Sequence, residues 1–451
     1  MAAIDRPLRP RTALRRRAVV AVAAGIAAVL LGSSPSAAYA DSVRRDQWQI
    51  RELDAPSAWA LSSGDGVTVA VIDSGVDATH PDLIGQVLPG ADFVDGTTDG
   101  RIDPVGHGTT VAGLIAGRDD DSSGVVGLAP HAKILPVRVL DKNNRYDDPA
   151  IVAKGITWAV DHGATVINLS LGGQLRSDVL ATALAYAAQH DVVVIACTGN
   201  VTADSTSRDV WYPAREAGVV AVAGLVSADA MPAAAPPTAD RSAVGGAGGS
   251  GSTESLWNGS LTGAPTVLVA PAVNLLGAKA GGGYWRVQGT SFAAPLVAAT
   301  ASLIRSRYPT LTAPNVINRL ISTARDLGRP GRDSQYGYGE VDPAAALAAE
   351  VAPVKGNPLG DVAPVAKNAP STSPTAKSSG QGSDVPGAPG APSASADPAT
   401  DGVGLAARAA AMERRLGPSA AIGTLVAAGL FGVGLILTRR PRSTPRHLRR
   451  R

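Results

Sequence analysis

Short runs of aliphatic residues alternate with helix-like segments through the middle of this 451-residue chain. The run VTVAVID at 67–73 is continuously apolar and rich in β-branched side chains, as expected for a strand buried on both faces. Runs of the same kind occur at 132–140, 164–173, 192–200, 219–225 and 266–271. Strands that alternate with helices predict an α/β fold, in which helices cover both faces of a mainly parallel sheet.

Helix boundaries can be predicted from capping residues. Asp148 and Pro149 begin one helix, which Gly163 ends, because an acidic N-cap, a proline in the first turn and a glycine after the last turn suit these positions. Ser177 and Thr312 are the predicted N-caps of two more helices. Segments 107–117 and 291–308 also read as helices, whereas 227–263 is rich in Ala, Pro, Gly and Ser and predicts a loop insertion.

The N-terminal 40 residues have the layout of a secretory signal peptide. A basic stretch with Arg15, Arg16 and Arg17 precedes an apolar run, and the sequence AYA ends at Ala40. We expect cleavage after Ala40. The alternative is a retained membrane helix, but the apolar run is short for a span and the Ala-x-Ala ending favours cleavage.

The C-terminal part of the chain predicts a membrane anchor. Residues 418–438 carry no charge and are just long enough to cross a bilayer, and the basic tail 439–451 should stay in the cytoplasm. The preceding 351–417 is rich in Pro, Ser, Gly and Ala, which predicts a disordered linker. A buried core helix at 418–438 is the alternative, and its flanks argue against it. These features predict a single-pass cell-membrane protein whose folded domain is extracytoplasmic.

Charge and cysteine content narrow the function classes. The net charge is +3, but six arginines lie within 1–40 and ten within 405–451, so the middle of the chain is acidic. A nucleic-acid partner is therefore not expected. The single cysteine, Cys197, excludes an internal disulfide. Its apolar surroundings predict a small buried side chain, with a cysteine nucleophile as the alternative.

Four polar residues stand at predicted strand ends or helix starts, where open α/β sheets bind ligands. Asp73 closes a strand and can orient a histidine or cap a turn. His107 lies between two glycines at a helix start and is catalytic or structural. Asn200 ends a strand and can donate to an oxyanion or form a turn. Ser291 starts an alanine-rich helix, as a nucleophile or an N-cap.

The sequences around these residues resemble the signature blocks of subtilisin-like serine proteases. The blocks are VAVIDSGVDATHPDL, GHGTTVAGLIAG, INLSLGG, the Gly-Asn pair before residue 201, and GTSFAAP. The resemblance implies a subtilisin-like three-layer fold over 61–350 and a catalytic triad of Asp73, His107 and Ser291. It also implies Asn200 and the Ser291 N–H as oxyanion donors, and a substrate-binding strand formed by Ser170, Leu171 and Gly172.

A narrower resemblance is to the mycosins, the membrane-anchored subtilases of type VII secretion systems. It rests on VDATHPDLIGQVLPGADF, AKILPVRVL, GYGEVDPAAAL and the layout of the termini. It implies that 41–60, which contains DQWQIRELDAPSAW, is an N-terminal extension that packs on the catalytic domain. Mycosins usually carry disulfides, and one cysteine allows none here.

The predicted function is that of an extracytoplasmic serine endopeptidase that works through an acyl-enzyme and takes part in type VII secretion. Its partners would be peptide substrates, the membrane and the secretion complex. Two alternatives are a general degradative subtilase of the cell surface and a structural brace of a membrane complex. No cofactor is required by this chemistry. The acidic loop 119–124 could hold Ca²⁺, and a solvated loop is the alternative.

Overall fold

A computed structural model describes residues 42–120, 123–201, 207–227, 254–361 and 380–382, all within one compact unit. The predicted signal peptide 1–40, the membrane segment 418–438 and the basic tail 439–451 lie outside the described residues. So do most of the predicted insertion 227–263 and most of the linker 351–417. Among the described residues, no helix is both long enough and apolar enough for a membrane span.

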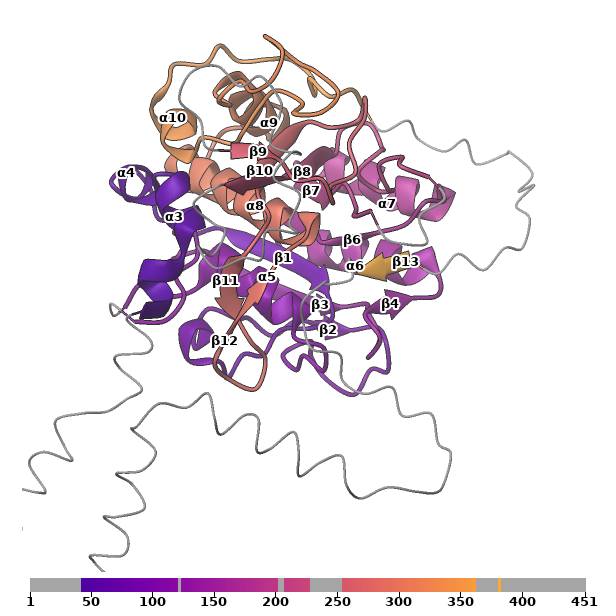
Figure 1. Ribbon diagram of the computed structural model, residues 1–451. Helices are drawn as coiled ribbons and strands as arrows, with labels where there is room; N and C mark the ends of the chain where they lie inside the picture. Colours follow the sequence, from indigo (N-terminus) through magenta and orange to yellow (C-terminus); the bar gives the residue numbers. More distant parts are fainter. Residues whose placement is uncertain (1–41, 121–122, 202–206, 228–253, 362–379, 383–451) are drawn as a thin grey trace, which may run out of the picture. The chain divides into compact units, whose positions relative to one another are not determined.

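A twisted, mainly parallel sheet forms the centre of the domain (Figure 1). In sheet order its strands are β10 (Leu268–Pro271), β8 (Val220–Ser227), β7 (Val193–Cys197), β5 (Val166–Leu169), β1 (Thr68–Asp73), β3 (Lys133–Arg138) and β2 (Ala91–Asp92). A short antiparallel strand, β9 (Glu254–Leu256), pairs with β8. The predicted α/β class and its parallel sheet are confirmed, because each aliphatic run of the sequence contains one of the parallel strands.

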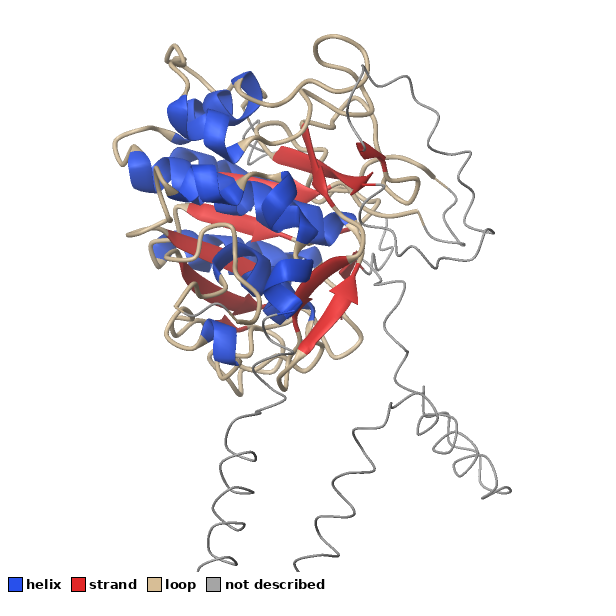
Figure 2. Ribbon diagram, turned by 60° about the vertical axis from the view of Figure 1, so that its left-hand side comes forward, coloured by secondary structure: helices blue, strands red, loops and turns tan. Residues whose placement is uncertain are grey.

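Helices lie on both faces of this sheet (Figure 2). The helices are α5 (His107–Ala116), α6 (Pro149–Asp161), α7 (Asp178–Gln189), α8 (Thr290–Arg307), α9 (Ala313–Ser322), α10 (Pro343–Ala348) and the short 3-10 helix η1 (Pro81–Leu83). Helices α5 and α8 pack against each other, as do α6 and α7, and each pair contacts the central strands. The parallel strands therefore end at one common edge, next to the first turns of α5 and α8.

The capping predictions mostly hold. The Asp148 carboxylate accepts the Ala150 N–H at 2.8 Å, and Ser177 Oγ accepts the Leu180 N–H at 3.4 Å. Thr312 occupies the N-cap position of α9, but its side chain makes no capping hydrogen bond. The Thr312 hydroxyl instead accepts from the Asn315 amide at 2.8 Å. The Asp191 carboxylate takes over at the helix start, where its Oδ1 accepts the Ala313 N–H at 2.5 Å.

The N-terminal extension comprises α3 (Trp48–Glu52) and α4 (Ala55–Trp59), which pack against the body of the domain. Trp48 Nε1 donates to the Val273 carbonyl at 3.1 Å, and the Gln47 amide pairs with the main chain of Val126 in both directions at 2.9 Å. Helix α4 contacts α10. A hairpin of β11 (Leu275–Ala278) and β12 (Tyr284–Val287), which no pattern in the sequence predicted, lies beside α5.

Two parts of the predicted linker are among the described residues. The first, 351–361, runs along α9, where the Val354 N–H donates to Asn315 Oδ1 at 2.8 Å. The second is a strand, β13 (Gly380–Gly382), which pairs with β4 (Arg145–Tyr146) and β6 (Leu171–Gly172). Neither contact was predicted from the sequence, since both segments are poor in large apolar residues.

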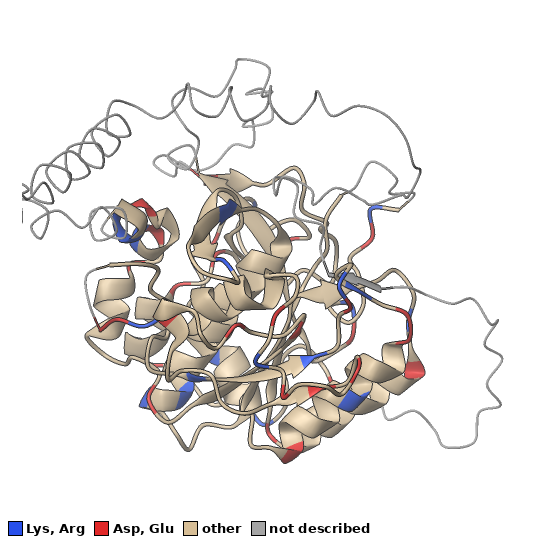
Figure 3. Ribbon diagram, turned by 90° about the horizontal axis from the view of Figure 1, so that it is seen from below, with Lys and Arg blue, Asp and Glu red and all other residues tan. Residues whose placement is uncertain are grey.

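Basic and acidic residues are interspersed along the described part of the chain (Figure 3). Several of them pair with each other, such as Arg138 with the buried Asp92 at 2.8 Å and Arg305 with Asp191 at 2.9 Å.

Candidate active site

The end of β1 and the start of α5 bring Asp73 and His107 together. His107 Nδ1 lies 2.7 Å from Asp73 Oδ1, and the two side chains are 1% and 0% exposed. Gly106 caps α5 with a φ of +95°, a conformation that glycine adopts without strain and that lets the chain turn sharply into the helix. With the Nδ1 proton held by the carboxylate, Nε2 is left as the basic nitrogen, and it is buried without a hydrogen-bond partner among the described residues.

The surroundings of His107 favour its protonated form. Burial by itself lowers the pKa of the imidazole, but the charge and the hydrogen bond of Asp73, with a further contribution from the charge of Asp103, outweigh it. The pKa of His107 is therefore raised above its ordinary value of 6.5. An imidazolium that forms here during a reaction would be stabilised by the two carboxylates.

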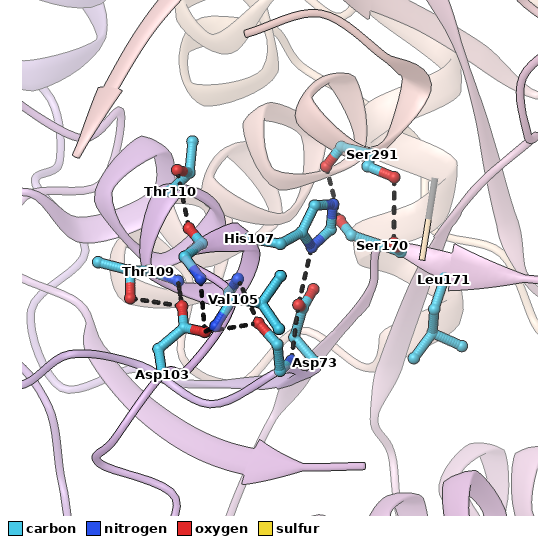
Figure 4. Close-up of polar contacts among 12 residues, drawn as sticks. Asp73, Asp103, Val105, His107, Thr109, Thr110, Ser170, Leu171 and Ser291 are labelled. Carbon is cyan, nitrogen blue, oxygen red and sulfur yellow. Dashed lines mark hydrogen bonds and ion pairs between the residues drawn. The ribbon is translucent and has the colours of Figure 1, made fainter. Parts of the chain in front are cut away.

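Asp103 is a buried acid beside the site that the sequence analysis did not single out. Its buried carboxylate accepts five hydrogen bonds, drawn in Figure 4, and thereby fixes the loop that leads into His107. The donors are Ser74 Oγ at 2.9 Å, the Val105 N–H at 3.0 Å, the Gly106 N–H at 2.8 Å, and the N–H and Oγ1 of Thr109 at 2.8 and 2.6 Å. Burial raises the pKa of Asp103, and these donors oppose that rise. An aspartate just before a predicted helix start was the available signal.

Ser291 is the second residue of α8 and does not cap it. The N-cap is Gly289, with no side-chain capping bond, so the N-cap alternative for Ser291 is wrong. The Ser291 hydroxyl is fully buried and donates to the Ser170 carbonyl at 3.0 Å (Figure 4). The next residue, Phe292, places its ring 5.2 Å from that of His107, centre to centre, so the start of α8 lies against the histidine.

Pro295 explains how Ser170 holds the start of α8. A proline has no N–H, so the Ser291 carbonyl four residues earlier lacks its usual helical donor. Ser170 Oγ fills that role and donates to the Ser291 carbonyl at 2.6 Å. Asn168 Nδ2 in turn donates to Ser170 Oγ at 2.9 Å. Pro295 lies inside α8, and the Ser170 hydroxyl compensates for the hydrogen bond that it removes.

The Asn200 side chain is held by its oxygen, which leaves its nitrogen available. Asn200 Oδ1 accepts from the N–H and the Oγ1 of Thr290, both at 3.0 Å. Asn200 Nδ2 is buried and has no hydrogen-bond partner among the described residues. Because Thr290 immediately precedes Ser291, this orphaned donor belongs to the same small region as the serine hydroxyl.

Of the predicted substrate-binding residues, Leu171 and Gly172 form β6, and Ser170 directly precedes it and contacts Ser291. A side chain at Gly172 would bring its Cβ within 2.7 Å of the Tyr212 carbonyl, so the strand requires glycine there. Cys197 is fully buried beneath this region, with its sulfur 3.8 Å from Ser291 Oγ and 3.9 Å from the Leu171 carbonyl. The predicted burial of Cys197 is confirmed, and the residue also touches the site.

The acidic loop 119–124 has an arginine as its partner in the described residues. Arg44 pairs with Asp119 at 2.6 Å and donates to the carbonyls of Arg118 and Ser123, both at 3.0 Å. Asp121 lies outside the described residues. The guanidinium thus supplies positive charge to carbonyl and carboxylate oxygens that would otherwise suit a hard cation.

Comparison with known proteins places this site in a family context. Residues 64–339 match the model of the subtilase family, peptidase S8. Fervidolysin of Fervidobacterium pennivorans is 35% identical over 331 residues, which cover 68% of this chain and 44% of fervidolysin. The chain therefore spans less than half of that relative. Subtilisin E of Bacillus subtilis is 36% identical over 309 residues, which cover 68% of this chain and 72% of subtilisin E.

Solved structures of mycosins are also similar. MycP1 from Mycobacterium smegmatis matches with a TM-score of 0.55 and 27% identity, over 68% of this chain and 85% of MycP1. The MycP3 protease from the type VII (ESX-3) secretion system matches with a TM-score of 0.53 and 28% identity, over 71% of this chain and 90% of MycP3. Given the parallel sheet, the buried Asp–His pair beside a helix-start serine, and the match over 64–339, the chain belongs to the subtilase family of serine peptidases.

Proposed function

We propose that this chain is a serine endopeptidase in which Ser291 is the nucleophile, His107 the general base and Asp73 its orienting carboxylate. The observation that carries the proposal is the buried 2.7 Å contact between His107 Nδ1 and Asp73, which leaves Nε2 as the free base next to the start of α8. For attack, the Ser291 hydroxyl turns from the Ser170 carbonyl to Nε2. Catalytic hydrogen bonds commonly tighten in this way once substrate is bound.

The reaction proceeds through an acyl-enzyme. His107 takes the hydroxyl proton as Ser291 Oγ attacks the peptide carbonyl, and the imidazolium then protonates the leaving amine. Asn200 Nδ2 and the Ser291 N–H donate to the oxyanion, and the first turn of α8 adds its positive dipole end. His107 next activates a water molecule that releases the acyl group and restores the serine hydroxyl.

Substrate recognition would be by strand addition. β6 offers main-chain groups of Leu171 and Gly172 next to the nucleophile, and an extended peptide can pair with such an edge through its own backbone. Backbone pairing holds the substrate in the extended form that presents a peptide bond to Ser291. Because it uses groups common to all peptides, side-chain selectivity must come from the pockets that flank the strand.

The proposed setting is the outer face of a cell membrane, as a mycosin-like component of a type VII secretion system. Support comes from the predicted signal peptide 1–40, the uncharged segment 418–438 followed by arginines, and the similarity to MycP1 and MycP3. The protein's partners would then be the membrane, a secretion complex and the peptides it cuts. A strain that carries Ser291→Ala separates this enzymatic role from a structural one, because a brace would still support secretion without the hydroxyl.

The enzymatic proposal is tested with a serine-directed phosphonate probe and a peptide substrate. Ser291→Ala should abolish both labelling and cleavage, because the attacking hydroxyl is removed. Ser302→Ala is the matched control, since Ser302 lies on the same helix and its hydroxyl bonds the Ala298 carbonyl at 2.8 Å, away from His107. Labelling of the Ser291→Ala protein at wild-type level would refute the assignment.

A further inference from the structure

The strand β13 is an unexpected neighbour of β6. It is the central strand of a three-stranded antiparallel sheet with the order β4-β13-β6, as the right-hand side of Figure 1 shows. Gly382 pairs with Leu171 and Gln381 with Gly172, while on the other edge Gln381 pairs with Arg145 and Gly380 with Tyr146. The backbone of 380–382 is therefore inserted between two segments that would otherwise present open edges.

The place that β13 occupies is the one expected for a substrate. Ser170, which directly precedes β6, accepts the hydrogen bond of the Ser291 hydroxyl on its carbonyl at 3.0 Å. Since β13 runs antiparallel to β6, its direction from Gly380 to Gly382 leads toward the Ser170 end of that strand. An extended peptide with this polarity approaches the nucleophile with the carboxyl side of its chain foremost, as the acyl part of a substrate does.

The chain's own connectivity allows this contact within one molecule. The described residues break off at Asp361 and resume at Gly380. The intervening segment 362–379 can span up to about 60 Å when fully extended, which exceeds the diameter of a domain of this size. Covalent attachment through a linker of this length also gives the strand an effective concentration on the order of millimolar, so that even a weakly binding strand competes with dilute substrates.

The N-terminal extension lies elsewhere. Its contacts join Trp48 to Val273, Glu52 to Arg325 and α4 to α10. These contacts tie the extension to the body of the domain, whereas the contacts of β13 are with the edge strands β4 and β6. The strand that pairs with β6 is therefore β13, which comes from the segment C-terminal to the catalytic domain, and not the N-terminal extension.

We propose that residues 380–382 act as a tethered pseudo-substrate, which pairs with β6 and competes in cis with peptides for the cleft of Ser291. This inference rests on the proposed peptidase function and adds a regulation to it. Release of the strand, by tension on the tether, by cleavage of the tether or by a tighter substrate, raises activity. Glycines on both sides of Gln381 suit such a strand, because residues without side chains fill no specificity pocket strongly and leave the strand displaceable.

The test uses the full chain in detergent and a proline at the centre of the strand. Gln381→Pro removes an N–H and fixes φ, which a strand paired on both sides does not tolerate. We expect the KM for a small chromogenic peptide to fall about two- to tenfold with kcat unchanged, as for loss of a competitive inhibitor at millimolar effective concentration. Thr372→Pro is the matched control in the same linker and should leave both constants as in the wild type.

Amide hydrogen exchange provides a readout that does not depend on activity. The exchange is measured in the Ser291→Ala protein and in its Gln381→Pro and Thr372→Pro derivatives. The amides of β4 and β6 should exchange faster in the Gln381→Pro derivative than in the other two proteins. Equal KM values and equal exchange in all three proteins would overturn the pseudo-substrate. If neither the wild type nor Gln381→Pro cleaves peptides but exchange differs as expected, the peptidase assignment fails while the strand contact stands.

Discussion

The link between Ser170, Ser291 and Pro295 leads to a prediction about the rigidity of the nucleophile. Ser170→Ala removes the donor that satisfies the Ser291 carbonyl at 2.6 Å, and it also removes the acceptor of Asn168 Nδ2 at 2.9 Å. A buried polar group left unsatisfied costs about 1–3 kcal/mol, so two such groups should lower the free energy of unfolding by about 2–6 kcal/mol. The first turn of α8 should also loosen, which lowers kcat.

A second substitution tests the stated cause. Pro295→Ala restores an N–H at the position from which a helix normally bonds the Ser291 carbonyl. In the Ser170→Ala background, this change should recover about 1 kcal/mol and part of kcat, because the orphaned carbonyl regains a donor. In the wild-type background the carbonyl already has its donor, so Pro295→Ala should gain less. The two backgrounds together form a double-mutant cycle.

The free energies are measured by urea unfolding in the inactive Ser291→Ala background, which prevents self-digestion, and kcat is measured with a chromogenic peptide. Ser302→Ala serves as the control for loss of a buried hydroxyl on α8. A coupling energy of zero between positions 170 and 295 would refute the idea that Ser170 compensates for the proline. In that case the effect of Ser170→Ala would be one of general packing.

Two further predictions concern an oxyanion donor and a buried acid. Asn200→Ala should keep phosphonate labelling but reduce kcat by about 10²–10³, because the transition state loses one donor worth about 2.7–4 kcal/mol; an unchanged kcat in steady-state assays would exclude that role. Burial raises the pKa of Glu340 to about 8, despite its contact with Arg325. The folded protein then holds more protons than the unfolded chain between about pH 4.5 and 8, so the melting temperature should fall as pH rises through that window. Glu340→Gln should flatten this decline, and an unchanged slope would contradict it.

Much of the fold was predictable because its signals are local. Buried parallel strands appear as continuous aliphatic runs, and capping residues such as Asp148 and Ser177 act on neighbours two or three positions away. Asp73 and His107 could be singled out because the ends of parallel strands meet at one edge of the sheet. Thr312 shows the limit of this reasoning, since its hydroxyl took a side-chain partner instead of the helix N–H groups.

The parts that escaped prediction depend on contacts between distant segments. Asp103 gains its importance from the Ser74 hydroxyl and the loop around it, and no spacing rule identifies that network. The role of Ser170 follows from the absence of an N–H at Pro295, 125 positions later in the chain. The strand 380–382 contains two glycines and a glutamine and pairs with β4 and β6 through its backbone, so composition carried no sign of it.

The N-terminal extension packs against residues that are synthesised much later, so it can reach its final place only late in translation. Glu52 bonds Arg325, which lies 273 residues later, and Trp48 bonds Val273, which lies 225 residues later. The ribosome must therefore produce Val273, Ser291 and Arg325 before the first helices can reach their final place. A nascent chain that stalls between Ser291 and Arg325 has already made its nucleophile but still lacks the arginine that Glu52 bonds. Completion of the enzyme is thus tied to nearly full-length translation of the catalytic domain.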